Sequence, residues 1–433
     1  MKSLLGISRP IWHCFFKRML SVLLMALLAA CGKDNEPVKP EDTYTDVPYD
    51  GVEGGVQPMT GIVFWNDNDH LDTDAIQMEY AYVRYSDICS QKDSYNWDAV
   101  ERILAGTASR KHQAIVRFYY TYPGKKSAVP DYIKALPDYK ETVGKSEGLR
   151  TWFPDWRCSE LQRFHKEFYR LFAERYDSDP RLAFLETGFG LWAEYHIYDG
   201  PFIVGQTFPS EAFQAEWLQA MDGWFRQTPW CISIDAAQYG PFEKTPALLD
   251  GGFGNFDDSF MCEEHDRYNA EDWLFFGKDR YERAPLGGEF SYYTDYDQEH
   301  CLDAGGIHGR SFESEAARYH LTFIIGNDQP DYQPMSRIRS ASKATGYRFQ
   351  LVRFAVKEGD SAVLTIKNIG VAPIYQDAFP TVDGVRGEFN LRTLMPGDSA
   401  TVTIATHTAS TASVPGVICD RLVQGQHIDF FSR

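Results

Sequence analysis

The stretch LQRFHKEFYRLFAERYDSDPRLAFLE, residues 161–186, joins a helical pattern to a strand pattern and decides the fold. Large apolar side chains recur along its first part at helical spacing. They are Phe164, Phe168, Leu171, Phe172 and Tyr176. The short apolar run Leu182–Glu186 follows a polar turn and is typical of a buried strand. An amphipathic helix that leads into a buried strand is the building unit of α/β folds.

The same alternation extends over residues 59–345. The other predicted strands are Gly61–Trp65, Tyr80–Tyr85, Ala114–Tyr119, Cys231–Ala236, Ser259–Cys262, Leu286–Phe290 and Leu321–Ile325. Helical patterns at Trp97–Ala105 and Ser210–Trp224 lie between strands. This repetition favours a (β/α)8 TIM-type barrel over an open doubly wound sheet. No GxGxxG or GxxxxGK[ST] motif follows the first strand, which argues against a nucleotide-binding fold.

The pattern changes after Gly346, where helical periodicity ends. Tyr347–Val356, Ala362–Ile366 and Ala400–Ala405 are predicted strands, separated by turns such as Glu358-Gly-Asp360. We therefore expect a small β-sandwich over residues 346–433, after a (β/α)8 barrel over residues 59–345.

The N-terminus has the charge and hydropathy pattern of a signal sequence. Residues 1–18 contain four basic side chains and no acidic one, and the apolar run Met19–Ala30 is too short to span a bilayer. The sequence Leu28-Ala-Ala-Cys31-Gly32 then predicts cleavage after residue 30 and diacylation of Cys31. Two acyl chains anchor a protein stably. The alternative is an ordinary signal peptide with a chance cysteine.

Residues 31–58 are rich in Asp, Glu, Pro and Gly, which predicts a flexible tether. The acidic residues directly after Cys31 resemble the surface-export signal of Bacteroidetes lipoproteins. We therefore expect an outer membrane lipoprotein, facing the periplasm or the cell surface, that touches the membrane only through its lipid anchor.

Charge and cysteine content exclude several classes of protein. Loss of residues 1–30 removes four basic residues, so the net charge falls from −18 to −22 and argues against nucleic acid as a partner. The six cysteines beyond Cys31 lack CxxC spacing, which argues against a zinc site. We expect buried thiols with one or two disulfide bridges, no cofactor and no metal.

The first candidate site follows the fourth predicted strand. In a barrel, active sites collect at the carboxyl ends of the strands. The sequence Leu185-Glu-Thr-Gly-Phe-Gly-Leu-Trp-Ala-Glu-Tyr-His196 places two glycines, where the backbone can turn sharply, at such an end. Trp192 offers a flat apolar face for a sugar ring, and we expect Glu194 and His196 to point into the barrel opening.

The second candidate site ends the seventh predicted strand, in Leu286-Gly-Gly-Glu-Phe-Ser-Tyr-Tyr293. Glycoside hydrolysis needs two carboxyl groups, one protonated to release the leaving oxygen and one ionised to attack carbon or activate water. Glu194 and Glu289 are the candidates for these roles. The alternative is that either glutamate is a surface or salt-bridged carboxylate.

Further polar and aromatic residues stand near the predicted strand ends. Candidate substrate-binding residues are Trp65, Asp67, Arg84, Tyr119, Glu186, Trp192, His196, Asp235, Tyr292, His308 and Asn327. Arg117 lies in the third strand, and Asp257 and Asp258 are expected just before the sixth. Arg84 is equally compatible with a structural partner of a buried acid, and His308 is more typical of a hydrogen-bonding residue than of a metal ligand.

Several of these motifs together resemble a bacterial lipoprotein family known as domain of unknown function 4832. They are the signal box, Arg84-Tyr-Ser-Asp87 running on to Tyr95-Asn-Trp97, the Gly188–His196 turn, the Gly287–Phe290 strand end and Gly346-Tyr-Arg-Phe349. Its barrel is similar to clan-A glycoside hydrolases, which implies Glu194 as acid/base and Glu289 as nucleophile. Clan-A enzymes usually carry Asn-Glu at the fourth strand, whereas Ala193 precedes Glu194 here, so Glu186 remains a rival acid.

The sequence therefore predicts a glycoside hydrolase that acts on a poly- or oligosaccharide through two carboxylates. Retention requires carboxyl groups about 5–5.5 Å apart, and a gap of about 6.5–9.5 Å means inversion. One alternative is a non-catalytic surface glycan-binding lipoprotein of a polysaccharide-uptake system. Another is a polysaccharide lyase acting on an acidic sugar, which would need a local basic patch to offset the negative charge.

Overall fold

The computed structural model describes residues 43–50 and 53–432. The predicted signal peptide, Cys31 and the first part of the tether lie outside the described residues. From Tyr44 onward the chain forms one compact unit. No helix in the described part combines the length and the apolar character that a membrane crossing requires.

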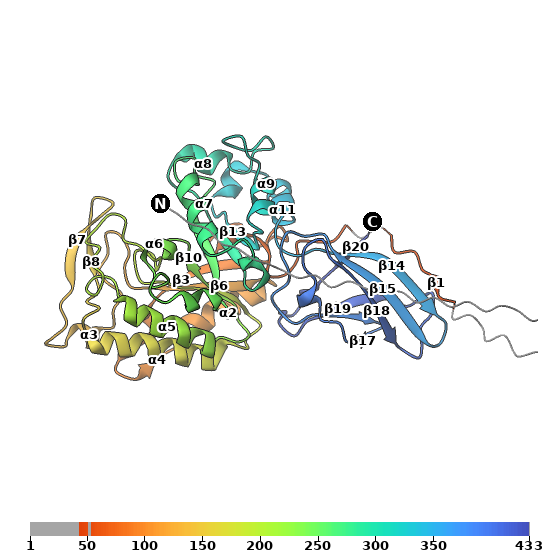
Figure 1. Ribbon diagram of the computed structural model, residues 1–433, viewed down its shortest axis with the longest axis horizontal. Helices are drawn as coiled ribbons and strands as arrows, with labels where there is room; N and C mark the ends of the chain where they lie inside the picture. The colour runs from red at the N-terminus through yellow and green to blue at the C-terminus, as the bar shows by residue number, and fades with distance from the viewer. Residues whose placement is uncertain (1–42, 51–52, 433) are drawn as a thin grey trace, which may run out of the picture. The chain divides into compact units, whose positions relative to one another are not determined.

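Eight parallel strands close into a barrel, which confirms the predicted (β/α)8 fold (Figure 1). In order around the barrel the strands are β2 (Gly61–Trp65), β3 (Met78–Arg84), β6 (Gln113–Tyr119), β9 (Leu182–Glu186), β10 (Trp230–Ser233), β11 (Gly254–Phe260), β12 (Leu286–Phe290) and β13 (Phe323–Ile325). All eight neighbouring pairs are parallel, including β13 with β2, which closes the ring.

Helices connect the strands. They are α1 (Tyr85–Ile88), α2 (Asp98–Ser109), α3 (Asp131–Lys134), α4 (Ser159–Tyr176), α5 (Glu211–Trp224), α6 (Ala236–Tyr239), α7 (Asp266–Phe275), α8 (Asp295–His300), α9 (Phe312–Arg318), α10 (Gln329–Tyr332) and α11 (Met335–Ser342), with short 3-10 turns η1 (Pro246–Asp250), η2 (Arg280–Glu282) and η3 (Leu391–Thr393). The three helical patterns found in the sequence fall on α2, α4 and α5. The Ser210 hydroxyl caps α5 by accepting a hydrogen bond from Phe213 N at 3.3 Å.

The sixth strand is longer and begins earlier than the predicted Ser259–Cys262, because β11 starts at Gly254. The prediction that Asp257 and Asp258 precede this strand is therefore wrong. Both belong to β11, where Asp258 reaches Arg117 and Asp257 accepts hydrogen bonds at 3.0 Å from Asn269 of α7. A strand with acids on both faces has no apolar run, so the pattern of apolar residues does not predict it.

Two antiparallel sheets follow the barrel, consistent with the predicted β-sandwich. One sheet contains β14 (Phe349–Lys357), β15 (Ser361–Asn368), β18 (Ser399–Ala405), β1 (Thr45–Asp46) and β20 (Phe430–Phe431), and the other contains β16 (Phe379–Val382), β17 (Val385–Arg386) and β19 (Pro415–Ile418). The region 31–58 is predicted to be a flexible tether, but within it β1 pairs with β14, and Val56 is buried. Main-chain pairing with the sheet edge fixes this segment despite its polar composition.

All six cysteines beyond Cys31 lie in the described residues, and every one is a buried free thiol. The expectation of one or two disulfide bridges is therefore wrong. The thiols are distributed over separate elements, such as Cys231 in β10 and Cys301 after α8, where each packs into its own local core.

The apolar stripe of α4 packs against the barrel wall. The Phe168 ring lies 4.7 Å from the Phe118 ring of β6 and 4.8 Å from the Tyr85 ring, centroid to centroid. Phe164 and Phe172 are equally buried in the same cluster. This contact holds the helix on the strands whose ends carry the candidate site.

Replacing Phe168 by Ala would leave a cavity between α4 and the barrel. We expect the free energy of unfolding to fall by about 3–5 kcal/mol, as measured by denaturant titration. Arg170→Ala on the same helix is the matched control, because its ion pairs with Glu167 and Glu174 are at the surface and it should change stability by about 0.5 kcal/mol or less. Equal losses for the two variants would contradict this packing.

Candidate active site

The loop after β9 folds back tightly over the carboxyl ends of the strands. Trp192 and Ala193 adopt φ angles of 50° and 63°, and the backbone nitrogen of Gly190 donates a hydrogen bond to Glu194 O at 2.7 Å. A Cβ atom added to Gly190 would lie 1.8 Å from His196 O, so only glycine permits this approach. The turn directs the Glu194 side chain back toward the barrel axis.

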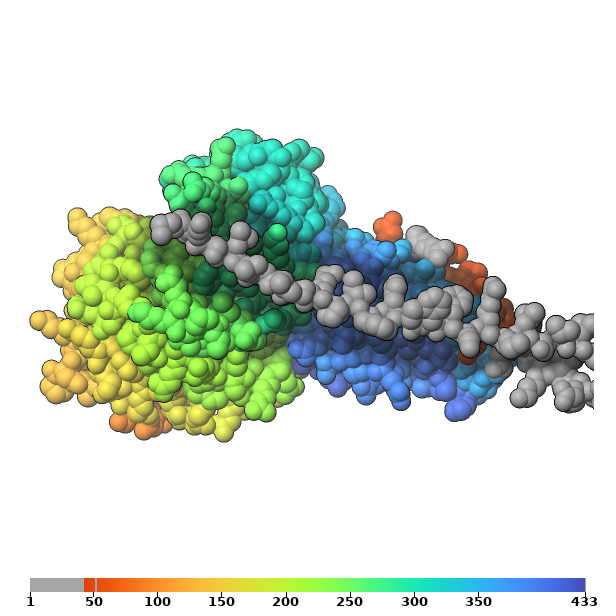
Figure 2. Space-filling model, viewed as in Figure 1, coloured from red at the N-terminus to blue at the C-terminus, as the bar shows by residue number. Residues whose placement is uncertain are grey.

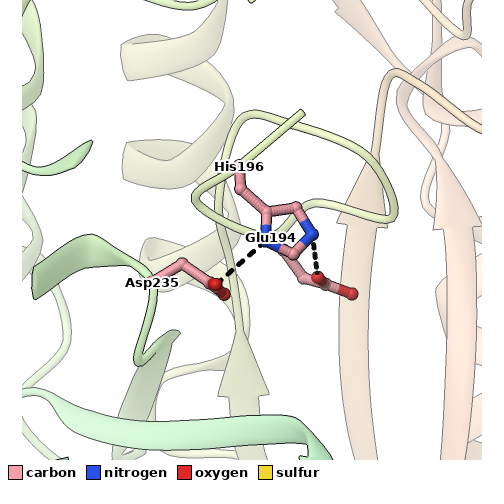
Figure 3. Close-up of side chains that lie close together, drawn as sticks. All are labelled: Glu194, His196 and Asp235. Carbon is pink, nitrogen blue, oxygen red and sulfur yellow. Dashed lines mark ion pairs between the residues drawn. The ribbon is translucent and has the colours of Figure 1, made fainter. Parts of the chain in front are cut away.

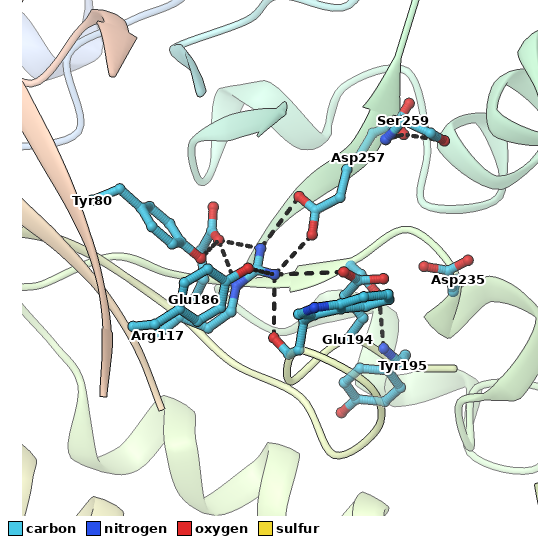
Figure 4. A network of polar contacts seen from close by, with 12 residues as sticks. Tyr80, Arg117, Glu186, Glu194, Tyr195, Asp235, Asp257 and Ser259 are labelled. Atoms are coloured by element: carbon cyan, nitrogen blue, oxygen red, sulfur yellow. Dashed lines mark hydrogen bonds and ion pairs between the residues drawn. The ribbon is translucent and has the colours of Figure 1, made fainter. Parts of the chain in front are cut away.

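A buried arginine lies at the centre of the site (Figure 4). Arg117 of β6 pairs with the Glu186 carboxylate, and its Nε donates to Glu186 Oε2 at 2.9 Å. Tyr80 Oη donates to the same oxygen at 2.7 Å. Burial raises the pKa of Glu186 to about 7, although Arg117 opposes this shift. Glu186 has no exposed surface, and its carboxylate pairs with Arg117, whereas Glu194 reaches the barrel opening.

Arg117 also reaches toward the barrel opening. Its Nη1 donates to Asp258 Oδ2 at 2.7 Å and to the backbone oxygen of Trp192 at 3.3 Å. The same nitrogen lies 3.7 Å from Glu194 Oε1. One guanidinium therefore connects the buried Glu186 with two acids at the opening.

Glu194, His196 and Asp235 form a row of three titratable side chains (Figure 3). His196 Nε2 lies 2.8 Å from Glu194 Oε2, and His196 Nδ1 lies 2.9 Å from Asp235 Oδ1. Burial disfavours charge on His196, but the two carboxylates outweigh it and raise the pKa of His196 well above its usual value. His196 in turn outweighs burial at Asp235, whose pKa is lowered.

Glu194 itself behaves differently from Asp235. Its side chain is 8% exposed, and burial, followed by the charge of Asp258, raises the pKa of Glu194 to about 8 although His196 opposes the shift. A carboxyl group with such a pKa holds its proton at neutral pH and can donate it.

This row is also the one group among the described residues with the spacing of a metal site. One ligand atom each from Glu194, His196 and Asp235 can be chosen within 4.8 Å of one another. Both imidazole nitrogens already face carboxylate oxygens, so the arrangement serves His196 as a cation between two acids.

Glu289 lies at the carboxyl end of β12, at the same end of the barrel as Glu194. A Cβ atom added to Gly288 would lie 2.1 Å from Asp257 O, so the glycine lets β12 pack closely on β11. Glu289 is half-buried, and its Oε1 has no hydrogen-bond partner among the described residues. Burial first, and then the charges of Asp258 and Glu194, raise the pKa of Glu289 well above its usual value, while Arg117 lowers it.

The charge of Glu194 therefore reaches Glu289, and the two candidate catalytic glutamates share a neighbour, Tyr82. Burial raises the pKa of Tyr82 well above its usual value, Arg117 opposes this, and charges on Glu289, Asp258 and Glu194 add to it. The Tyr82 hydroxyl also accepts a hydrogen bond from Arg117 at 3.2 Å. Carboxyl groups this strongly coupled titrate as a set, in which ionisation of one member keeps a proton on another.

Two of the predicted substrate-binding residues line a polar cavity of about 290 Å³. Its lining residues are Asp67, Asn68, Asp69, His70, Asn327, Asp328, Pro330 and Asp331. Asn327 accepts a hydrogen bond from Trp65 N at 3.0 Å, so its side chain also fixes the end of β2. Tyr292 connects this cavity to the acids, because its pKa is raised by burial first and then by the charges of Glu289 and of the cavity residue Asp328.

Two other predicted residues, Arg84 and His308, pair with carboxylates outside the candidate acids. Arg84 is 56% exposed and pairs with Asp87 at 2.9 Å, which is a surface ion pair. His308 lies between Asp297, at 2.8 Å, and Glu263, at 3.3 Å.

Two aromatic predictions are closer to the site. Trp192 stacks on Tyr198 with ring centroids 5.9 Å apart. Tyr119 is buried, with its ring 5.9 Å from Tyr82 and 5.7 Å from Tyr122.

Sequence reasoning missed the roles of Tyr80, Tyr82 and Asp258. One signal was present, since Arg117 interrupts the apolar run Ala114–Tyr119, and a charge inside such a run requires a buried acid as partner. The identity of that partner follows only from the barrel closure that brings β6, β9 and β11 together.

Comparison with solved structures gives remote likenesses. A GH5_18 variant from Bifidobacterium longum in complex with Manb1-4GlcNAc is 13% identical, with a TM-score of 0.38 over 62% of this chain and 68% of that one. An α-galactosidase from Thermus thermophilus is 12% identical, with a TM-score of 0.40 over 70% and 64%. The catalytic domain of a β-amylase from Paenibacillus polymyxa is 10% identical, with a TM-score of 0.44 over 67% and 100%.

Neither a protein-family model nor a curated protein matches the chain. Its resemblance to the family of domain of unknown function 4832 therefore stays a prediction. At the identities and TM-scores above, the solved structures add nothing to the site, whose chemistry follows from the side chains of this chain.

The protonated Glu194 makes stability depend on pH. Its pKa is raised from 4.5 to about 8 on folding, so between these values the folded state holds a proton that the unfolded state lacks. The resulting stability is fully present below the unfolded pKa and is lost as pH rises through the folded one. We expect wild type to lose more stability than Glu194→Gln between pH 5 and pH 9, by at least about 1 kcal/mol in urea unfolding.

Glu282→Gln is the matched control for this measurement, because Glu282 is exposed in η2. It should keep the wild-type dependence on pH. A Glu194→Gln variant with the same dependence as wild type would show that Glu194 is ionised in the folded protein.

Proposed function

We propose that this chain is a glycoside hydrolase that cleaves a poly- or oligosaccharide with Glu194 as acid/base and Glu289 as nucleophile. The observation that carries the proposal is the group of acids around Arg117 at one barrel opening. Arg117 Nη1 lies 3.7 Å from Glu194 Oε1 and donates to Asp258 Oδ2 at 2.7 Å, and the charges of Arg117, Asp258 and Glu194 all act on Glu289. Burial there raises the pKa of Glu194 to about 8, so that it holds a proton near neutral pH. A proton donor beside a second carboxyl group is the arrangement that glycosidic bond cleavage requires.

The proposed reaction begins when Glu194 donates its proton to the leaving glycosidic oxygen while the ionised Glu289 attacks the anomeric carbon. The negative charge left on Glu194 is stabilised by Arg117, 3.7 Å away, and by His196 at 2.8 Å. Water then attacks the glycosyl–Glu289 ester, and Glu194 takes up the proton of that water. This cycle retains the anomeric configuration.

Asp235 and His196 act on this reaction through Glu194. The Asp235 carboxylate keeps His196 protonated, and His196 Nε2 lies 2.8 Å from Glu194 Oε2. The imidazolium therefore stays protonated throughout the reaction, and its positive charge stabilises Glu194 when Glu194 becomes an anion.

Aromatic and polar surfaces around the acids fit a glycan. Tyr198, stacked on Trp192, and Tyr292 are 58% and 46% exposed and offer flat faces to sugar rings. The cavity lined by Asp67 and Asn327 offers acceptors for sugar hydroxyl groups.

One observation favours the second candidate, a non-catalytic glycan-binding protein. The pKa of Glu289 is also raised well above its usual value, and a protonated Glu289 is not a nucleophile. In such a protein the aromatic surfaces would bind glycan, and the acids would supply hydrogen bonds alone.

Hydrolysis of a panel of oligosaccharides separates the two candidates. We expect wild type to cleave at least one glycan, and Glu194→Gln and Glu289→Gln to lower kcat by about 10²-fold or more, since each removes a group that acts in the transition state. The Glu282→Gln control should keep the wild-type rate. Proton NMR of the first-formed product should show the anomeric configuration of the substrate.

If Glu289→Gln keeps the wild-type turnover rate, Glu289 is not the nucleophile. Glycan binding without cleavage of any panel member would establish the binding protein instead. An inverted product would mean that Glu289 acts on water rather than on the anomeric carbon.

We further propose that diacylated Cys31 anchors the mature protein to the outer membrane. The support is the signal sequence Leu28-Ala-Ala-Cys31-Gly32. We expect wild type in the detergent-soluble membrane fraction and Cys31→Ser in the aqueous fraction, because the variant has no thiol to acylate. Equal membrane retention of Cys31→Ser would contradict the anchor, and Cys14→Ser is the matched control.

A further inference from the structure

Four exposed basic side chains gather beside the candidate active site and form what we call the basic patch. Lys125 and Lys126 belong to the loop after β6, and Lys145 and Arg150 belong to the hairpin of β7 (Thr142–Ser146) and β8 (Leu149–Phe153). None of the four makes an ion pair with an acid of the described chain, although acidic residues outnumber basic ones by 61 to 43.

Aromatic rings hold three of these cations. Lys126 Nζ lies 3.7 Å from the centroid of the Trp152 ring, and the Arg150 guanidinium lies 4.8 Å from the same centroid. Lys125 Nζ lies 4.0 Å from the centroid of Tyr122. Such contacts orient the cations without neutralising them.

The loop and the hairpin form one surface. Trp152 N donates a hydrogen bond to Lys125 O at 3.4 Å, and Gly124 N donates to Thr151 Oγ1 at 3.0 Å. In Figure 1 the hairpin extends at the side of the barrel, and in Figure 2 the yellow surface of this region lies uncovered.

The patch is unfavourable for the isolated protein. Lys145 and Arg150 stand directly opposite each other across the antiparallel pair of β7 and β8. Like charges in this position destabilise a hairpin. An anionic ligand would remove that repulsion, because each cation would then have an opposite charge.

The patch is continuous with the loop that carries Glu194. The Tyr122 ring lies 6.2 Å from the Trp192 ring, and Trp192 N donates to Thr121 O at 3.0 Å. Trp192 also stacks on the exposed Tyr198. A row of aromatic faces therefore leads from Glu194 to the cations.

We infer that the basic patch binds an acidic sugar residue of the glycan, one that carries a carboxylate or a sulfate. This inference rests on the proposed function, because it adds a specificity to the same site. The sugar ring would lie against Trp152 or Tyr122, and its anionic group would accept hydrogen bonds from Lys126 and Arg150.

The charges at the barrel opening limit where the acidic residue binds. Glu194, Asp235, Asp258 and Glu289 lie at the centre, and Asp67 with its acidic neighbours lines the cavity near the ends of β2 and β13. An anionic sugar at either place would be repelled. The structure therefore favours a mixed glycan, with a neutral residue at the scissile bond and an acidic one toward the patch, over a continuous polyanion such as nucleic acid.

Binding measurements on the full chain test this inference. Glu194→Gln is used as the background so that glycans remain intact. Calorimetry compares hyaluronan (a carboxylate on every second residue), κ-carrageenan (a sulfate on every second residue), neutral galactan and single-stranded DNA. We expect at least one acidic glycan to bind about tenfold or more tightly than galactan and DNA. Preference between the two acidic polymers identifies the anionic group.

Variants then assign the binding to the patch. Lys126→Gln combined with Arg150→Gln should weaken acidic-glycan binding about tenfold or more, because each loses a charge-assisted hydrogen bond, and should leave galactan binding unchanged. Lys278→Gln is the matched control, since Lys278 is exposed between α7 and η2 and should have no effect. Unchanged melting temperatures of all variants exclude loss of folding.

The inference is overturned if galactan or DNA binds as tightly as both acidic glycans, or if the double variant keeps the acidic-glycan affinity. Acidic-glycan binding by a wild-type protein that cleaves nothing would support the patch and reject the hydrolase. Cleavage of neutral glycans without any affinity for acidic ones would support the hydrolase and reject the patch.

Discussion

The buried guanidinium of Arg117 is the interaction on which the rest of the site depends. A buried charge requires compensation, and Arg117 finds it in Glu186 below and Asp258 above, on two further strands of the barrel. This fixes the ends of β6, β9 and β11 relative to one another. It also sets a positive charge beneath the opening, without which Glu194, Asp258 and Glu289 would repel one another unopposed.

The loop after β9 brings the candidate acid Glu194 next to Arg117. Its glycines allow the backbone to close on itself, so that Glu194 comes within 3.7 Å of Arg117 while His196 lies on the other side. Glu186, only eight positions earlier, stays buried on the same arginine. Two glutamates from one strand–loop unit therefore differ in role because one is enclosed by Tyr80 and Arg117 and the other reaches the opening.

The sequence predicted most of the barrel because seven of its strands contain apolar runs that need no knowledge of their neighbours. β11 was misplaced because Asp257 and Asp258 serve two different faces, one toward α7 and one toward Arg117. The positions of Glu194 and Glu289 after strands were predictable, as each follows glycines at a strand end. The pairing of Arg117 with Glu186 was not, because it depends on the order of strands around the closed barrel.

Charge is unevenly distributed around this site, and the distribution bears on what it binds. The centre holds coupled acids around one arginine, so it favours a neutral group and retains protons near neutral pH. The flank formed by β7, β8 and the loop after β6 holds cations on aromatic rings, in a chain of net charge −18. A basic flank is the condition under which a strongly acidic protein can take an anionic glycan. The negative charge of the whole chain therefore does not exclude an acidic sugar, because a ligand at contact distance experiences the nearest side chains more strongly than the distant ones.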